Sequence, residues 1–184
     1  MTSDISLPMM TEKSLLLVLD GHAMVHRAWH GIQQPLSLRK TGEDVRAVYG
    51  FLNTFLRTVA DWRPTHCAIA FDLSDPTFRH VQYDKYKEHR PPTPPELRRQ
   101  FEYVREIMDV FKVPILDMSG YEADDVIGTL CHQAEEHQIK SLILTGDTDT
   151  LQLVSSWVRV LMTSGAQKKT VYDELAVRGR YGGL

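Results

Sequence analysis

The sequence predicts an α/β fold of three layers, in which a mainly parallel central sheet carries helices on both faces. Three short apolar runs, at residues 14–20, 66–72 and 141–145, have the composition of buried strands. They alternate along the chain with longer segments whose apolar residues recur at helical spacing. Strands that are apolar throughout and alternate with helices are typical of a parallel sheet covered on both faces. The 184 residues contain no internal repeat and suffice for one such domain.

Helices are predicted between these strands. Residues 21–32 follow the first strand and should begin a helix. Segments 43–62 and 96–112 are strongly amphipathic, and a third such helix should start at Ala123. Their apolar residues recur at intervals of three and four: Val45, Val48, Tyr49, Leu52, Phe55, Leu56 and Val59, then Leu97, Phe101, Val104, Ile107, Met108 and Phe111, then Ala123, Ile127, Leu130, Cys131 and Ala134.

The rest of the chain gives weaker signals. Residues 113–116 and 158–163 are further strand candidates. Residues 73–95 show no clean period and end in a proline cluster, which predicts a long loop or mobile arch. Residues 1–13 are polar and predict a flexible leader rather than a signal peptide, so that 14–184 form the domain.

Composition limits the possible functions. The net charge of −3 argues against a globally basic nucleic-acid binder, so such a role would need local positive charge. No apolar run is long enough to span a membrane. The two cysteines, Cys67 and Cys131, lie in apolar runs and are expected to be buried reduced thiols, as in a cytoplasmic protein.

Acidic residues follow three of the predicted strands. Because the carboxyl ends of parallel strands meet at one edge of a sheet, these acids should converge. The stretch GYEADDV at the start of the third amphipathic helix should join them from the same edge. Singly, each acid is also explained as a helix cap or turn residue. Together they predict a site for Mg²⁺ or Mn²⁺, because these ions prefer oxygen ligands. A pair of such ions can support the hydrolysis of phosphodiesters. The acids are Asp20, Asp72, Glu122, Asp124, Asp125, Asp147 and Asp149.

The aperiodic segment supplies cations and aromatic rings. Basic groups bind phosphates and aromatic rings stack on unpaired bases, although nearby acids leave a merely solvated loop as an open alternative. The residues are Phe78, Arg79, Tyr83, Lys85, Tyr86, Lys87 and Arg90, followed by Arg98 and Arg99. His22, His26 and His30 have helical spacing, but no cysteine accompanies them and Trp29 favours packing over a zinc site. No GxxxxGK[ST] or GxGxxG motif indicates a nucleotide cofactor.

Several motifs together resemble the flap endonuclease family, in particular the N-terminal 5′-nuclease domains of bacterial DNA polymerases I. They are VLDGHAMVHR, AVYGFLNTF, AFDLSDPTFRHVQYDKYKEHRPPTP, GYEADDVIGTL and LTGDTDTLQLV, and they span about residues 14–182. The resemblance implies a PIN-like core and assigns metal binding to the seven acids. It also implies that Lys87 and Arg90 act on the scissile phosphate, with Arg27 and Arg79 in support, and that Tyr86 stacks on a terminal base. Lys85 and Arg98 are further candidates for DNA contact.

The resemblance implies Mg²⁺-dependent cleavage of DNA near a 5′ end, flap or nick, in primer removal and repair, with a linked polymerase domain as a possible partner. Two features depart from the family. Thr148 stands where many relatives have a basic residue, and the sequence ends at RYGGL. Relatives continue into two further metal-binding acids and a helix-hairpin-type duplex-binding unit, so we expect one complete metal site, a partial second one and weak duplex binding. A PIN-type ribonuclease and a non-catalytic metal- and DNA-binding fragment are the alternatives.

Overall fold

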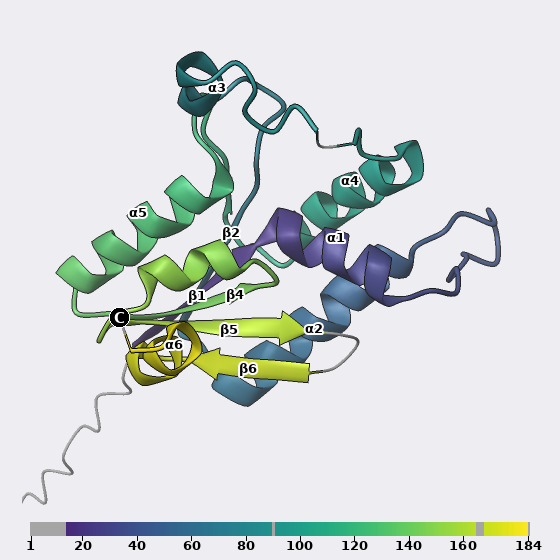
Figure 1. The fold of residues 1–184 in the computed structure, drawn as a ribbon. Helices are drawn as coiled ribbons and strands as arrows, with labels where there is room; N and C mark the ends of the chain where they lie inside the picture. The colour runs from purple at the N-terminus through teal and green to yellow at the C-terminus, as the bar shows by residue number, and fades with distance from the viewer. Residues whose placement is uncertain (1–13, 90, 165–167, 184) are drawn as a thin grey trace, which may run out of the picture.

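A six-stranded sheet forms the centre of the molecule in the computed structural model, which describes residues 14–89, 91–164 and 168–183 (Figure 1). The strand order is β3-β2-β1-β4-β5-β6, and only the β5–β6 pair is antiparallel. This confirms the predicted mainly parallel sheet. The strands are β1 (Leu15–Asp20), β2 (His66–Ala70), β3 (Ile115–Leu116), β4 (Lys140–Thr145), β5 (Val158–Ser164) and β6 (Lys168–Tyr172).

The helices lie where the periodicity predicted them, within a few residues at their ends. Four further elements were not predicted: the short helix α3, the 3₁₀ helix η1, strand β6 and helix α6. The helical elements are α1 (Gly21–Gly31), α2 (Arg46–Trp62), α3 (Phe78–Gln82), α4 (Pro95–Val110), α5 (Ala123–Glu136), η1 (Thr148–Leu153) and α6 (Glu174–Tyr181). In the part of the chain that the structure describes, every helix is too short or too polar to cross a membrane.

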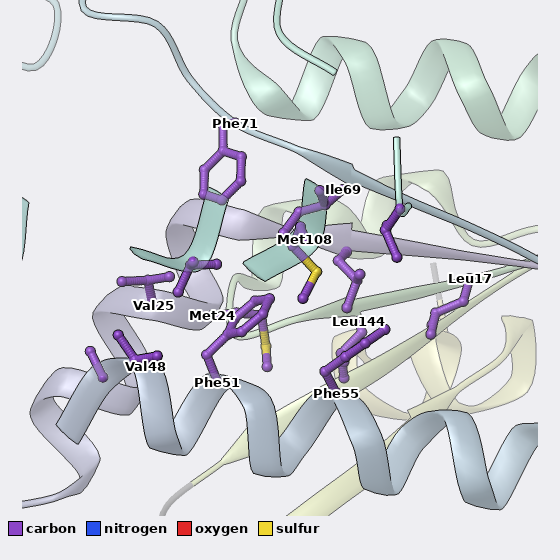
Figure 2. Close-up of a cluster of buried hydrophobic side chains, with 14 of the residues drawn as sticks. Leu17, Met24, Val25, Val48, Phe51, Phe55, Ile69, Phe71, Met108 and Leu144 are labelled. Carbon is purple, nitrogen blue, oxygen red and sulfur yellow. The ribbon is translucent and has the colours of Figure 1, made fainter. Parts of the chain in front are cut away.

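One face of the sheet packs against α1, α2 and α4. Leu17 and Leu19 of β1 point to this face, because alternate residues of a strand share one side. Figure 2 shows Phe51 and Phe55 of α2 beneath the strands, with Met108 of α4 in the same cluster. All five side chains are at most 5% exposed, so this face forms a continuous apolar core.

The other face of the sheet packs against α5 and η1. Val18 of β1 and Ile143 of β4 point to this side and contact the apolar stripe of α5, which includes Ile127 and Cys131. Cys131 is buried, as expected, whereas Cys67 is only half-buried, and both are free cysteines. The two covered faces establish the predicted three-layer architecture.

The segment predicted as a loop, residues 73–89 and 91–94 as described and here called the α3 segment, lies above the carboxyl end of the sheet between α5 and α4 (Figure 1). It contains the short helix α3, where His80 Nδ1 accepts the Thr77 N–H at 3.1 Å. The five residues of α3 are too few to show a hydrophobic period, which is why this helix was not predicted. Lys87 has a left-handed backbone with φ of +59°, which is rare for a residue other than glycine.

Candidate functional site

A cavity of about 190 Å³ lies at the carboxyl edge of the sheet. Six of the seven predicted acids line this cavity, from three strand ends and the start of α5: Asp20, Asp72, Glu122, Asp124, Asp147 and Asp149. His22, Tyr86 and Lys87 also contribute to its wall.

Asp20 is the last residue of β1 and also the N-cap of α1, so no loop separates strand from helix. Its Oδ1 accepts the Ala23 N–H at 3.0 Å, and its Oδ2 accepts the Thr145 hydroxyl at 2.6 Å. Only 4% of the residue is exposed. Burial raises the pKa of Asp20 to about 6, although both hydrogen bonds favour the ionised form.

Asp72 follows β2 and is held at both its main chain and its side chain. Its N–H donates to His22 Nδ1 at 3.1 Å, and its Oδ1 accepts the Ala123 N–H at 2.6 Å. Burial lowers the pKa of His22 to about 4. The imidazole is therefore neutral near pH 7, and its 3.7 Å approach to the Asp72 carboxylate is not an ion pair. These bonds tie the end of β2 to α1 and α5.

Asp147 and Asp149 lie just beyond β4, in the turn that opens η1. The Asp147 N–H donates to the Thr145 hydroxyl oxygen at 2.9 Å, and Asp147 Oδ1 accepts the Asp149 N–H at 2.9 Å. The Thr145 hydroxyl thus accepts from one acidic residue and donates to Asp20. Thr145 is completely buried, and its role was not predicted from the sequence. A polar residue ending an otherwise apolar strand was the available signal.

Asp124 lies in the first turn of α5 and faces the cavity. Within the described residues its carboxylate has no hydrogen bond or ion pair. The pKa of Asp124 is raised to about 7, chiefly by burial and then by the negative charges of Asp20, Asp147, Asp72 and Glu122, in that order of importance. Part of the cavity wall is thus a carboxyl group whose ionised form has no compensating partner.

Glu122 is the acid that the α3 segment contacts. Its Oε1 accepts from Lys87 Nζ at 2.7 Å, its Oε2 accepts from the Tyr86 hydroxyl at 3.0 Å, and Arg79 Nη1 lies 3.6 Å from Oε2. Glu122 is 8% exposed. The charge of this nearly buried carboxylate is therefore balanced by cations of the α3 segment, Lys87 and Arg79.

Asp125 is the one predicted acid that does not line the cavity. Its two oxygens accept hydrogen bonds from the two terminal nitrogens of Arg79, at 2.7 and 2.8 Å. This pairing lowers the pKa of Asp125. Asp125 Oδ2 also accepts the Glu122 N–H at 3.0 Å. The Asp125 side chain lies on the wall of a larger neighbouring cavity, which Thr148 also lines. Asp125 thus anchors the α3 segment and caps α5.

The donor chemistry of the cavity fits a hard divalent cation. Its acids are all oxygen donors, and a cation would neutralise the uncompensated carboxyl of Asp124. Over residues 14–89, 91–164 and 168–183, no three His, Cys, Asp or Glu side chains form a closed metal-ligand group. The acids therefore line a shared space without converging on one point.

The remaining predicted contact residues lie outside this cavity. Lys85 is exposed, and Arg98 is exposed with its Nε donating to the Thr93 carbonyl at 3.1 Å. Arg27 of α1 packs beside Gly146, just after β4, and burial lowers its pKa. Arg90 and the predicted leader 1–13 lie outside the described residues.

The fold and the site together define an α/β protein of the PIN-like 5′-nuclease class. Residues 15–182 match the family described as 5′-3′ exonuclease, N-terminal resolvase-like domain. The chain is 43% identical to DNA polymerase I of Chloroflexus aurantiacus over 173 residues, which are 92% of this chain and 18% of that protein. It is 36% identical to DNA polymerase I of Bacillus subtilis over 94% of this chain and 20% of that protein. The chain therefore belongs to the 5′-3′ exonuclease N-terminal domain family, whose members are nucleases of the hydrolase class.

Solved structures show the same fold at low identity. The T5 D15 protein co-crystallized with metal ions aligns with a TM-score of 0.69 at 17% identity, over 91% of this chain and 61% of that one. The catalytic core of Rad2 in complex with DNA substrate aligns with a TM-score of 0.54 at 13% identity, over 92% of this chain and 51% of that one. The chain spans about a fifth of the length of the DNA polymerase I relatives.

Proposed function

We propose that this chain hydrolyses phosphodiester bonds of DNA near a 5′ end, at flaps or nicks, with Mg²⁺ or Mn²⁺ as cofactor. The observation that carries the proposal is the acid cavity, where six carboxylates meet beside Lys87 and Tyr86 of the α3 segment. Family membership supports nuclease chemistry, and the T5 and Rad2 proteins with metal ions and DNA support this choice of cofactor and substrate.

The acids of the cavity would hold the metal. Asp20, Asp72 and Asp147 project from strand ends and Asp124 from the start of α5, so backbone elements fix their positions. A pair of divalent ions held by these acids would supply the activation of a water molecule and the stabilisation of the leaving oxygen of the phosphodiester. The raised pKa values imply that metal binding displaces a proton from Asp124 near neutral pH, and from Asp20 at slightly acidic pH.

The α3 segment would bind the substrate phosphate and base. Lys87 Nζ lies at the cavity wall, where a cation stabilises charge that develops on the phosphate oxygens. Tyr86 lies beside it with a ring on which a terminal base can stack. Arg79 holds the segment against Asp125, and Arg90 is a further cation of the same segment. DNA repair, primer removal and a linked polymerase domain are consistent with the DNA polymerase I relatives.

The test compares three substrates of one sequence: a 5′-flap DNA, a nicked DNA duplex and a single-stranded RNA. Each is incubated with Mn²⁺, with Mg²⁺ or with EDTA. We expect metal-dependent cleavage of the DNA substrates near the 5′ end. Asp124→Asn should abolish it, whereas Asp109→Asn, which alters an exposed acid on α4, should not.

The same assay separates the alternatives. Preferential cleavage of RNA would favour a PIN-type ribonuclease. Metal binding by calorimetry without cleavage of any substrate would favour a non-catalytic metal- and DNA-binding domain. Cleavage in EDTA, or unchanged cleavage by Asp124→Asn, would contradict the role assigned to the acid cavity.

A further inference from the structure

We propose that His22 is a positioning residue that sets the orientation of Asp72 at the acid cavity. The Asp72 N–H donates to His22 Nδ1 at 3.1 Å, and Asp72 Oδ1 accepts the Ala123 N–H at 2.6 Å. Asp72 therefore donates a hydrogen bond to the first turn of α1 and accepts one from the first residue of α5. The role of Asp72 as a metal ligand rests on the proposed function, whereas the hydrogen bonds do not.

Two aromatic side chains hold the His22 ring in place. The ring centroid lies 4.6 Å from that of Phe101 and 5.7 Å from that of Phe71, with a tilted and an edge-on arrangement respectively. Phe71 is 1% exposed, and the Arg105 guanidinium lies over its ring at 4.5 Å. A ring packed in this way keeps its nitrogen aimed at one N–H group.

The direction of the hydrogen bond fixes the chemical form of the ring. The Asp72 main chain supplies the proton, so His22 Nδ1 accepts and the ring proton lies on Nε2. His22 thus acts as an acceptor that fixes the peptide plane leading into Asp72. Residues behind a metal ligand orient it in this manner, and their loss typically weakens metal binding about 10–100-fold.

A pair of substitutions separates the acceptor from the ring. His22→Phe keeps an aromatic ring against Phe101 but removes the acceptor. His22→Asn loses the ring but carries an oxygen on Cγ, the atom that bears Nδ1 in histidine. His30→Phe, on the same helix but outside the lining of the acid cavity, is the matched control.

Mn²⁺ affinity is measured by titration calorimetry, and solvent exchange of the Asp72 amide hydrogen is measured by NMR without metal. We expect His22→Phe to weaken Mn²⁺ binding about 10–100-fold and to speed exchange of the Asp72 amide, with a thermal midpoint near that of the parent. His22→Asn should keep Mn²⁺ affinity within a few-fold of the parent, and His30→Phe should change neither readout.

Parent-like Mn²⁺ affinity and Asp72 exchange in His22→Phe would overturn the proposal. Equal losses in His22→Phe and His22→Asn would also overturn it, because the ring rather than the acceptor would then matter. If His22→Phe does not fold, His22→Ala is compared with His22→Asn, and equally weak Mn²⁺ binding by both contradicts the proposal. If the parent binds no Mn²⁺, the proposed function fails, while exchange of the Asp72 amide still decides the role of His22.

Discussion

The acid cavity and the α3 segment face each other, but they are held in different ways. Asp20, Asp72 and Asp147 lie at strand ends, and each is bonded to groups of neighbouring elements. The α3 segment reaches the cavity mainly through the long side chains of Arg79, Tyr86 and Lys87, with one main-chain bond from the Phe78 N–H to the Gly120 carbonyl at 2.9 Å.

This difference separates a fixed half of the site from an adjustable half. The negatively charged strand-end acids are held by the sheet, so they cannot move without breaking the pairing between strands. Positive charge is carried by a segment that contacts the acids through ion pairs and side-chain hydrogen bonds, and Lys87 adopts a left-handed backbone there. Such conformations cost roughly 1–3 kcal/mol and persist only where surrounding contacts hold them. We therefore expect changes in the α3 segment to affect catalysis more than stability, and changes beneath the acids to affect stability directly.

The largest expected effect tests the adjustable half. Lys87→Ala should slow cleavage of 5′-flap DNA about 10²–10³-fold, because it removes a cation aimed at developing phosphate charge. Its free energy of unfolding should change by less than about 1 kcal/mol, because Tyr86 and Arg79 still contact the Glu122 carboxylate after Lys87 is removed. Single-turnover kinetics at saturating enzyme measures the rate. Lys140→Ala, at the opposite edge of the sheet, should cleave like the parent, and equal rates for both variants would contradict the role of Lys87.

The next effect tests the fixed half. A Cβ atom at Gly21 would lie in steric conflict with the Phe71 ring, which leaves no room for a side chain directly after Asp20. Gly21→Ala should therefore destabilise the fold by about 1–3 kcal/mol, as overpacking typically does. Gly31→Ala, in the same helix but with open space around it, should be neutral or slightly stabilising. Urea denaturation of both variants measures the difference, and equal midpoints would show that Phe71 moves without cost.

A smaller effect should appear as a dependence on pH. The pKa of Asp124 is raised to about 7, above its ordinary value near 4. The unfolded chain therefore loses this proton at lower pH than the folded chain does, so the fold is favoured at low pH and loses stability as pH rises through 7. In EDTA, the difference in melting temperature between Asp124→Asn and the parent should grow by a few degrees between pH 5 and 8. A constant difference would contradict an uncompensated carboxyl at this position.

The smallest effect concerns the anchoring of the α3 segment. Arg79→Ala removes the paired hydrogen bonds to Asp125 and should speed limited proteolysis near Lys85, with a change in global stability below about 1 kcal/mol. Arg99→Ala, which alters an exposed arginine of α4, is the control. Proteolysis at the same rate in both variants would show that the other contacts of the segment, including those of Tyr86 and Lys87 with Glu122, suffice to anchor it.

The positions of the acids followed from the sequence because parallel strands place their carboxyl ends at one edge. The opposite outcomes for Asp124 and Asp125 follow from helix geometry. Neighbouring residues of a helix point about 100° apart, so one lines the cavity while the other meets Arg79. That geometry was available from the sequence and would have separated the two acids.

Other parts of the site depend on contacts between distant residues. The roles of Thr145 and His22 come from hydrogen bonds to partners at least 50 residues away in sequence, which no local pattern encodes. Strand β6 and helix α6 were not predicted because KKTVY is short and mostly polar and ELAVRGRY has only a weak apolar stripe. Their places are set by the edge of the sheet rather than by local preference.

The bond from Thr145 to Asp20 joins residues 125 positions apart, across the central strand β1 and its neighbour β4. During synthesis, β1 and β2 leave the ribosome long before β4. A nascent chain can therefore pair its first two strands while the wall formed by β4 and η1 is still missing. Contacts between such distant segments form late, because closing the long intervening chain costs entropy that only the finished sheet offsets. We expect the cavity to be among the last parts of the molecule to form, so that a newly made chain acquires the capacity to bind metal only when its fold is complete.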